Sequence, residues 1–324
     1  MLDAPSPLDY LRAVNPGRNS LLALIALLSF ASCGGSGAND AAAAEGGPRR
    51  IAVMAPSAAE MAVALGLQER VVAVGDFVRW PPLFRDLPRI GSYDTPNLET
   101  LLSLRVDLLV TSRSEAAARV HGEIRRLGID VLELNTTTYE ASLEALLEFG
   151  GRSGREDEAR AVADAMEARM AAVRAHSADL PARRVLFVAG RDPLYAAGPG
   201  SHVDELIRAA GGINVMADAL GAYQMVSLES ALERMPEVII NNSDVASDGR
   251  AGRYAGFWGS WDFLPAVEAD RVWWVDPQRL SIPGPRMPEM AELMQRLIHP
   301  ERFGAPAGGE LGPLTDPGGD SGAP

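Results

Sequence analysis

Apolar residues recur every three or four positions between Arg155 and His176, a spacing that predicts a long helix with one apolar stripe. Acidic residues gather at its start and Arg169 and Arg174 near its end, as the helix dipole favours. A helix of about 20 residues is about 30 Å long. We expect a helix within 152–180 that links two parts of the chain. The stripe comprises Ala159, Val162, Ala163, Met166, Met170 and Val173.

The sequences on the two sides of this helix share a pattern. Leu98-Glu99-Thr100-Leu101-Leu102 leads into the apolar run at 106–110, and Leu228-Glu229-Ser230-Ala231-Leu232 leads into 236–240, without a gap at an offset of 130. Each copy predicts a short helix, a glutamate at its start, and a buried strand. We therefore expect two similar α/β lobes, at 49–151 and 181–303, the first ending near Gly150-Gly151.

Short apolar runs alternate with helical patterns in both lobes, which predicts parallel sheets covered by helices. The runs that predict strands are 51–54, 71–74 and 129–134 in the first lobe, and 185–188, 213–216 and 272–275 in the second. From Gly304 onward the chain is rich in Gly, Pro, Ala and Asp. That composition predicts a disordered tail at 304–324.

The N-terminus carries a compartment signal. Arg12 and Arg18 precede an apolar run at 21–28 that is too short for a bilayer span, which needs about 20 residues. It is typical of a signal peptide. Small residues before Cys33 resemble a bacterial lipobox, so we predict a signal peptide at 1–33, a lipid on Cys33 and a flexible linker at 34–48. The alternative is an ordinary cleaved signal with an incidental cysteine. We expect a protein of the periplasm or cell envelope held by a lipid anchor.

The amino-acid composition and net charge exclude some classes of protein. Hydrophobic residues make up 47% of the 324 positions, which excludes disorder for most of the chain. The formal net charge is −13, and all 30 basic residues are arginines. Such an acidic chain is not expected to bind nucleic acid or anionic lipid through a general basic surface.

Motifs of catalysis are absent from the sequence. It contains no G-x-G-x-x-G after the first strand, no P-loop, no H-E-x-x-H and no G-x-S-x-G. Two or more histidines could converge on a metal, although they are scattered along the chain. We expect no catalytic residue, no metal site and no cofactor. The histidines are His121, His176, His202 and His299.

Aromatic residues, only 6% of the chain, are concentrated after predicted strands. In parallel α/β sheets ligands gather at the carboxyl ends of strands, and flat rings suit a large, partly apolar ligand. Each ring has the alternative role of anchoring its own loop, and at least one of Trp273 and Trp274 is expected in the core. Arg286 lies in a proline-rich loop that could hold its guanidinium toward a ligand. The rings in predicted loops are Trp80, Tyr93, Tyr195, Tyr223, Phe257, Trp258 and Trp261.

Several motifs, in order, resemble one protein family. They are R-I-x-x-x-A-P-S-A-x-E from Arg50, W-P-P from Trp80, G-S-Y-x-x-P-N-L-E from Gly91, D-P-L-Y from Asp192, A-G-G-x-N-V from Ala210, V-S-L-E from Val226 and P-G-P-R from Pro283. Over about Arg50 to Phe303 the chain resembles the substrate-binding proteins of ABC transporters for cobalamin and ferric siderophores. The resemblance implies two Rossmann-like lobes with parallel sheets, joined by a single long backbone helix.

The resemblance also implies roles for residues. Glu99 and Glu229 match two glutamates that form salt bridges with arginines of the permease dimer. Four rings match positions lining a corrinoid cleft, and Arg286 matches a polar contact there. The chain departs from the pattern because Tyr93 and Tyr223 stand where cobalamin binders often carry Trp, and because the loop 243–260 is long and Gly-rich. The four matching rings are Trp80, Tyr93, Tyr195 and Tyr223.

We therefore expect a monomeric carrier that captures a metal chelate between two lobes and delivers it to an ABC permease with its ATPase. A corrinoid is favoured over haem or a ferric siderophore, because siderophore binders use several arginines and here only Arg286, Arg79 and Arg191 are candidates. The alternatives are a chelatase-like enzyme with the same architecture and a binding protein adapted to signalling.

Overall fold

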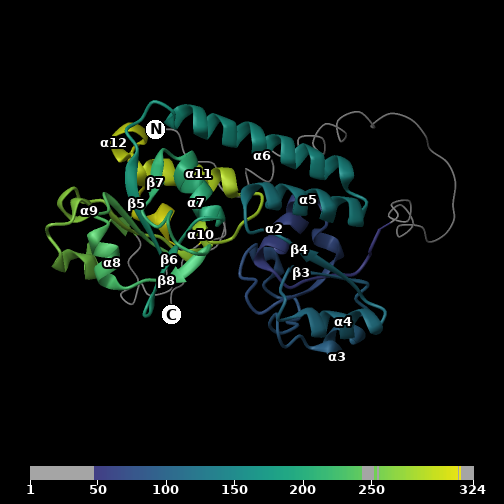
Figure 1. The fold of residues 1–324 in the computed structure, drawn as a ribbon. Coiled ribbons are helices and arrows are strands. Elements are labelled where there is room, and N and C mark those ends of the chain that lie inside the picture. The colour runs from purple at the N-terminus through teal and green to yellow at the C-terminus, as the bar shows by residue number, and fades with distance from the viewer. Residues whose placement is uncertain (1–46, 243–251, 254, 313, 315–324) are drawn as a thin grey trace, which may run out of the picture. The chain divides into compact units, whose positions relative to one another are not determined.

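The computed structural model describes residues 47–242, 252–253, 255–312 and 314. They form two compact units (Figure 1). The first unit comprises the described residues up to Leu134 together with Leu146–Ala163, and the second comprises Asn135–Ala145 and the described residues from Asp164 onward. The predicted signal peptide with Cys33, and nearly all of the predicted linker, lie outside the described residues.

The first unit contains a four-stranded parallel sheet with the strand order β2-β1-β3-β4. In this sheet Ile51 is paired with both Val71 and Leu108. The predicted parallel sheet is thus confirmed for this unit. The strands are β1 (Ile51–Val53), β2 (Val71–Val74), β3 (Leu108–Ser112) and β4 (Asp130–Leu134).

Helices cover both faces of this sheet, as right-handed crossovers require when the chain turns from β1 to β2 and then back across to β3. Helices α3 (Leu98–Ser103) and α4 (Ala118–Arg126) lie on one face, and α2 (Pro56–Ala64) lies on the other (Figure 1). Leu101 of α3 and Ile124 of α4 pack into a core that continues through the sheet residues Ala52, Leu109 and Val131.

Two helices follow β4. Helix α5 (Tyr139–Ser153) is followed directly by α6 (Glu156–Ser177), which is the long helix that the apolar stripe predicts. Gly150 and Gly151, near which the sequence predicts the end of the first lobe, lie inside α5. A Cβ on Gly150 would lie 2.3 Å from the Ala159 Cβ and 2.8 Å from the Arg155 carbonyl oxygen. Glycine is therefore needed for α6 to begin so close to α5.

The second unit contains the same parallel arrangement, with β7, β5, β9 and β11 side by side. Three further strands are antiparallel, because β6 pairs with β5, β8 with β6 and β10 with β11. The predicted parallel sheet is thus confirmed for the four central strands, and the three antiparallel strands add to it. The strands are β5 (Arg183–Arg191), β6 (Leu194–Ala197), β7 (Gly212–Asn214), β8 (Tyr223–Met225), β9 (Val238–Asn241), β10 (Gly252–Arg253) and β11 (Val272–Trp274).

Helices also cover both faces of the second sheet (Figure 1). Helices α8 (Leu228–Glu233) and α9 (Pro265–Glu268) supply the buried residues Ala231 and Ala266 to a core that includes Leu186 and Ile239. On the other face α7 (His202–Ala209) packs against α11 (Met287–Ile298). The short helices are α10 (Pro277–Leu280), α12 (Pro300–Phe303) and α13 (Gly308–Leu311).

The prediction of disorder from Gly304 onward is wrong for residues 304–312. Leu311 of α13 is fully buried, and its carbonyl oxygen accepts a hydrogen bond of 2.8 Å from the Asp276 amide. The Arg296 guanidinium donates to both carboxylate oxygens of Glu310, at 2.6 and 3.0 Å. This segment is therefore part of the second unit. Position 313 and residues 315–324 of the predicted tail lie outside the described residues.

No helix in the described part of the chain combines the length and the apolar character that crossing a membrane requires.

Candidate functional site

Tyr195 and Tyr223 lie on one face of an antiparallel strand pair, not in loops as predicted. β6 and β8 pair Tyr195 with Met225 and Ala197 with Tyr223, so these side chains project to the same side. Tyr195, Tyr223 and Met225 are 42%, 44% and 64% exposed, whereas Ala196 between them points into the core. We call Tyr195, Tyr223 and Met225 the tyrosine face. It is an exposed apolar surface on a rigid element.

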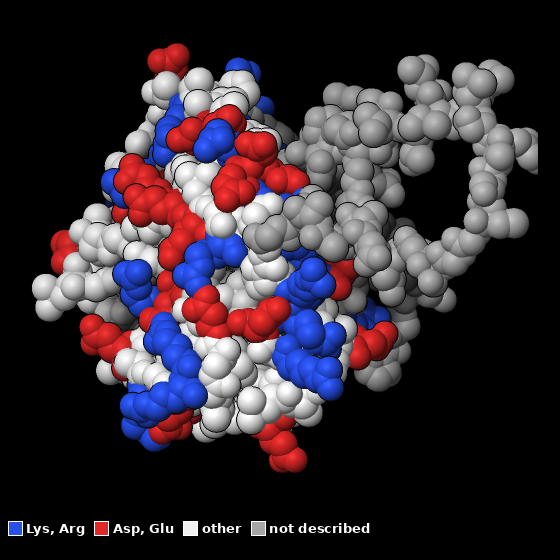
Figure 2. All heavy atoms as spheres, turned by 90° about the vertical axis from the view of Figure 1, so that its right-hand side faces the viewer, with Lys and Arg blue, Asp and Glu red and all other residues white. Residues whose placement is uncertain are grey.

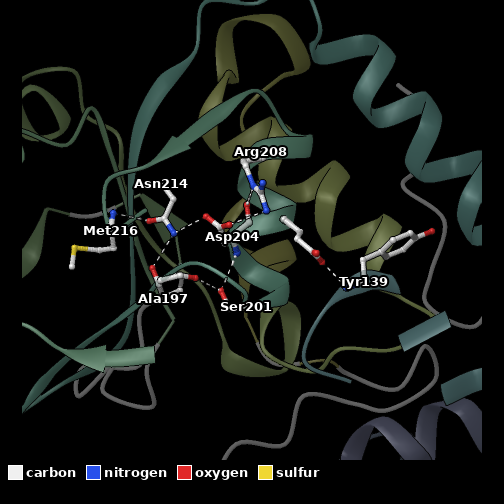
Figure 3. Close-up of polar contacts among 9 residues, drawn as sticks. Tyr139, Ala197, Ser201, Asp204, Arg208, Asn214 and Met216 are labelled. Atoms are coloured by element: carbon white, nitrogen blue, oxygen red, sulfur yellow. Dashed lines mark hydrogen bonds and ion pairs between the residues drawn. The ribbon is translucent and has the colours of Figure 1, made fainter. Parts of the chain in front are cut away.

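A network of buried hydrogen bonds holds the end of β6 in place (Figure 3). The side-chain amide of Asn214 donates to the Ala197 carbonyl and to the Asp204 carboxylate, both at 3.0 Å, and its oxygen accepts from the Met216 amide at 3.0 Å. Ser201 caps α7 by accepting from the Asp204 amide at 3.1 Å. Because a satisfied buried network holds one geometry, the strand that carries Tyr195 is held firmly.

Tyr223 and Tyr93 keep their phenol protons over the physiological range. Partial burial raises the pKa of Tyr223 to about 12, although 44% of the residue is exposed. Burial also raises the pKa of Tyr93, against the opposing effect of a hydrogen bond with Ser112. Both rings therefore offer a neutral aromatic surface and a hydroxyl donor.

The first unit presents a separate pair of rings. Tyr93 is half-buried and stacks on Phe77, with ring centroids 5.8 Å apart and an angle of 11° between the planes. Phe77, which the sequence reasoning missed, is exposed and follows β2 in the chain, a position that already indicated a strand-end loop. Trp80 is only 2% exposed, so its ring packs within the protein in this structure and offers no open face. The contact of Trp80 with a ligand stays a prediction.

Arg286 is buried in this structure. Its side chain is 4% exposed, and its guanidinium donates to the Gln278 carbonyl at 2.9 Å. It stands directly before α11, so it links that helix to α10. A buried guanidinium needs such a partner, because burying its charge without one is costly. The contact of Arg286 with a ligand stays a prediction.

Glu99 and Glu229 occupy equivalent positions in the two units. Each is the second residue of a six-residue helix, and each is exposed. The helices begin alike, since Asn97 accepts from the Thr100 amide at 3.0 Å and Ser227 from the Ser230 amide at 3.1 Å. Neither glutamate makes a hydrogen bond or ion pair with any residue that the structure describes. Their carboxylates are therefore available to a partner.

A second group of rings lies in the second unit. Phe257 contacts Trp258 and Trp261 edge to face, at centroid distances of 5.3 and 5.0 Å. Trp258 is fully buried and donates from its indole nitrogen to the Asn241 side chain at 2.9 Å. The guanidinium of Arg191 lies over the Phe257 ring. Trp273 and Trp274 are both buried, so the expectation that at least one belongs to the core is confirmed.

Three of the four histidines are buried and bonded within the protein. His121 contacts the Glu133 carboxylate at 3.0 Å, His202 the Leu280 carbonyl at 3.2 Å and His299 the Gly211 carbonyl at 3.3 Å. Burial lowers the pKa of His202 to about 4, so it is neutral at pH 7. In the described part of the chain, no three His, Cys, Asp or Glu residues are grouped so that they could hold a metal.

Charge on the surface is mixed. Figure 2 shows acidic and basic side chains interspersed on the face that it presents. Interspersed charges do not form the continuous basic surface that nucleic acid binding uses.

Comparisons with known proteins agree on the family. The model of a periplasmic binding protein family matches residues 51–278. A vitamin B12-binding protein of Vibrio cholerae is 27% identical over 244 residues, which cover 75% of this chain and 86% of the relative. The crystal structure of BtuF, the periplasmic vitamin B12-binding protein of V. cholerae, is similar with a TM-score of 0.68 and 26% identity, covering 78% of this chain and 96% of that one.

A further solved structure shares the fold but is named for another ligand. The periplasmic heme-binding protein RhuT of Roseiflexus sp. RS-1, in its apo form, has a TM-score of 0.64 and 25% identity, covering 80% of this chain and 98% of that one. The family match spans β1 to β11 and thus the parallel sheets of both units. This chain therefore belongs to the periplasmic binding protein family, and the relatives named here are binding proteins, not enzymes.

Proposed function

We propose that this chain is the substrate-binding lipoprotein of an ABC importer and that its ligand is a corrinoid of the cobalamin type. The observation that carries the proposal is the tyrosine face, which presents Tyr195, Tyr223 and Met225 from two paired strands of a family member. Rings held on strands provide large contact area with little loss of side-chain entropy on binding. A broad, partly apolar ligand suits such a surface.

A corrinoid fits the described residues better than an iron chelate that needs protein ligands. Cobalamin carries its own axial base, so it requires no histidine, and the three buried histidines are already bonded within the protein. The relatives named for vitamin B12 support the same choice.

Haem or a ferric siderophore is the second candidate. The likeness to RhuT, which is named for heme, favours haem. An anionic ferric siderophore needs several cationic contacts, and one of the predicted arginines, Arg286, is buried and bonded to a carbonyl. We therefore rank the siderophore below haem.

The ligand proposal is tested by titrating the purified protein with cyanocobalamin and with hemin in parallel, while tryptophan fluorescence is followed. We expect saturable quenching by micromolar cyanocobalamin. Tyr195→Ala and Tyr223→Ala are expected to weaken binding about tenfold each, because a ring contact and its buried area are lost. Tyr195→Phe is the matched control and is expected to retain affinity. Saturation by hemin alone would replace the corrinoid with haem.

Delivery to an ABC permease is proposed from the two free carboxylates. Glu99 and Glu229 are exposed on equivalent helices, and carboxylates without internal partners suit arginines of a permease dimer. Charge reversal (Glu99→Arg with Glu229→Arg) is expected to abolish uptake in cells and to leave cyanocobalamin affinity unchanged. Uptake at the wild-type rate would remove the docking role without affecting the ligand proposal.

Membrane attachment is proposed through a lipid on Cys33, with the protein otherwise a monomer in the periplasm. One lipid-modified cysteine tethers a protein to a membrane without spanning it. Cys33→Ser is expected to release the protein into the soluble envelope fraction and to prevent incorporation of labelled fatty acid. Retention of the label by the Cys33→Ser protein would contradict this anchor.

A further inference from the structure

Arg191 stands at the carboxyl end of a central strand of the second sheet. It is the last residue of β5, which pairs with β9 on one side and, at this end, with β6 on the other, where Arg191 is opposite Leu194. In open α/β sheets, ligands bind outside the carboxyl ends of the strands.

Two rings orient the Arg191 guanidinium. Its central carbon lies 5.8 Å from the centroid of the Phe257 ring and 6.0 Å from that of Trp274. The rings are themselves fixed, because Trp274 is buried and Phe257 packs against buried Trp258. Stacking uses the flat faces of a guanidinium and leaves its N–H groups, which lie in the plane, free to donate.

The guanidinium has no polar partner among the residues that the structure describes. Arg253 provides the contrast, because it lies 4.6 Å over the Trp273 ring and is also paired with the Asp270 carboxylate at 3.3 Å. Arg191 is partly buried, so its donors lose some contact with water without gaining a protein acceptor. An oxyanion that accepts hydrogen bonds from two of these N–H groups would give the guanidinium the polar partner that it lacks.

We propose that Arg191 is a specificity-determining residue that binds an oxyanion of the ligand, either a phosphodiester or a carboxylate. The inference rests on the proposed function and deepens it. A corrinoid supplies the phosphodiester of its nucleotide loop, and a haem supplies its propionates. In both cases the ring-stacked guanidinium selects ligands that carry negative charge on their periphery.

The test compares Arg191→Met with the matched control Arg253→Met by calorimetric titration. The probes are cyanocobalamin and dicyanocobinamide, a corrinoid that lacks the phosphodiester. We expect Arg191→Met to bind cyanocobalamin about tenfold to a hundredfold more weakly than the wild type, as for loss of a charged hydrogen-bond pair. Its affinity for dicyanocobinamide is expected to match the wild type. Arg253→Met is expected to bind both probes as the wild type does.

A second pair of titrations uses hemin and its dimethyl ester, in which the propionates carry no charge. If haem is the ligand, Arg191→Met is expected to weaken binding of hemin and not of the ester. The thermal unfolding midpoint of each variant is measured alongside, so that loss of folding is recognised. Equal affinities of wild type and Arg191→Met for cyanocobalamin and hemin would overturn the inference and leave the proposed function standing. A wild-type protein that binds neither chelate would remove both.

Discussion

Arg105 and Met235 lie 130 positions apart and both adopt a left-handed backbone conformation, with φ of 50° and 45°. Each stands two residues after the last residue of its helix, α3 or α8, and three residues before a central strand, β3 or β9. A side chain in this conformation costs about 1–2 kcal/mol relative to glycine. The repeat visible in the sequence therefore extends to a strained turn in each unit.

Replacing Arg105 with glycine is expected to stabilise the first unit. Arg105→Gly relieves the backbone strain, and the gain is reduced by the greater freedom of glycine in the unfolded chain, leaving about 0.5 kcal/mol. Met235→Gly is the comparison: Met235 packs against the core of the second unit, so its loss is expected to destabilise by about 1 kcal/mol or more. Urea unfolding measures both. A lower midpoint for Arg105→Gly would contradict the account of strain.

Glu205 is expected to stabilise the start of α5. Its carboxylate accepts a hydrogen bond of 2.5 Å from the Tyr139 amide, in the first turn of that helix (Figure 3). The Arg174 guanidinium covers the Tyr139 ring at 5.8 Å. Glu205→Ala leaves a helix-end N–H without its acceptor and is expected to lower the unfolding free energy by about 0.5–2 kcal/mol.

Two variants make this measurement specific. Glu205→Gln retains an acceptor oxygen and is expected to lose less stability than Glu205→Ala. Glu167→Ala, at an exposed position of α6, is expected to change stability by less than about 0.5 kcal/mol. Equal losses for Glu205→Ala and Glu167→Ala would show that the hydrogen bond to Tyr139 contributes nothing measurable.

Stability is expected to fall as the pH drops from about 6.5 to about 4 because of His202. Burial lowers its pKa from 6.5 to about 4, and its contact with the Leu280 carbonyl opposes that shift only in part. In this window the unfolded chain binds a proton that the folded protein excludes, so stability is complete above pH 6.5 and decreases toward pH 4. The full effect is about 3 kcal/mol.

His202→Gln isolates this contribution, because glutamine is uncharged throughout the window and can still donate to Leu280. Urea unfolding at several pH values between 7.5 and 4 is compared for the two proteins. The lowered pKa of His299, also caused by burial, affects both proteins equally and cancels in the difference. If the unfolding free energies of the wild type and His202→Gln decreased by the same amount between pH 6.5 and pH 4, the prediction would be contradicted.

The segment 304–312 is expected to stabilise the second unit through Leu311. Leu311→Ala removes a fully buried side chain and is expected to cost about 2–4 kcal/mol. Leu220→Ala is the control, because Leu220 is 101% exposed and its truncation is expected to have almost no effect. Thermal unfolding of both variants tests this. Identical melting of Leu311→Ala and wild type would show that α13 does not contribute to the core.

Much of the fold follows from the sequence where two signals coincide. The repeat at an offset of 130 correctly predicts α3 and α8, since the apolar pattern and a glutamate near the helix start, Glu99 or Glu229, recur together. Helix α6 is predicted within a residue of each end, because its stripe is long and its charges follow the dipole. Periodicity over many residues is the strongest local signal.

The misses have physical causes that lie outside any local window. Gly150 resembles a boundary in the sequence, and only the packing of Ala159 against it shows why a helix contains glycine there. Strands β6 and β8 have four and three residues, too few for alternation to distinguish them from loops. Phe77 was overlooked because a single Phe after a strand is not a pattern. The roles of Trp80 and Arg286 at a ligand stay predictions, and their burial depends on neighbours that are distant in the sequence.

The most direct test of the central claim is a calorimetric titration of the wild-type protein with cyanocobalamin. The account predicts one ligand per chain with a dissociation constant of about 1 μM or tighter, and a loss of affinity when Tyr195 and Tyr223 are both replaced by alanine. An absence of binding heat at about 100 μM cyanocobalamin, or unchanged affinity in the double variant, would contradict it.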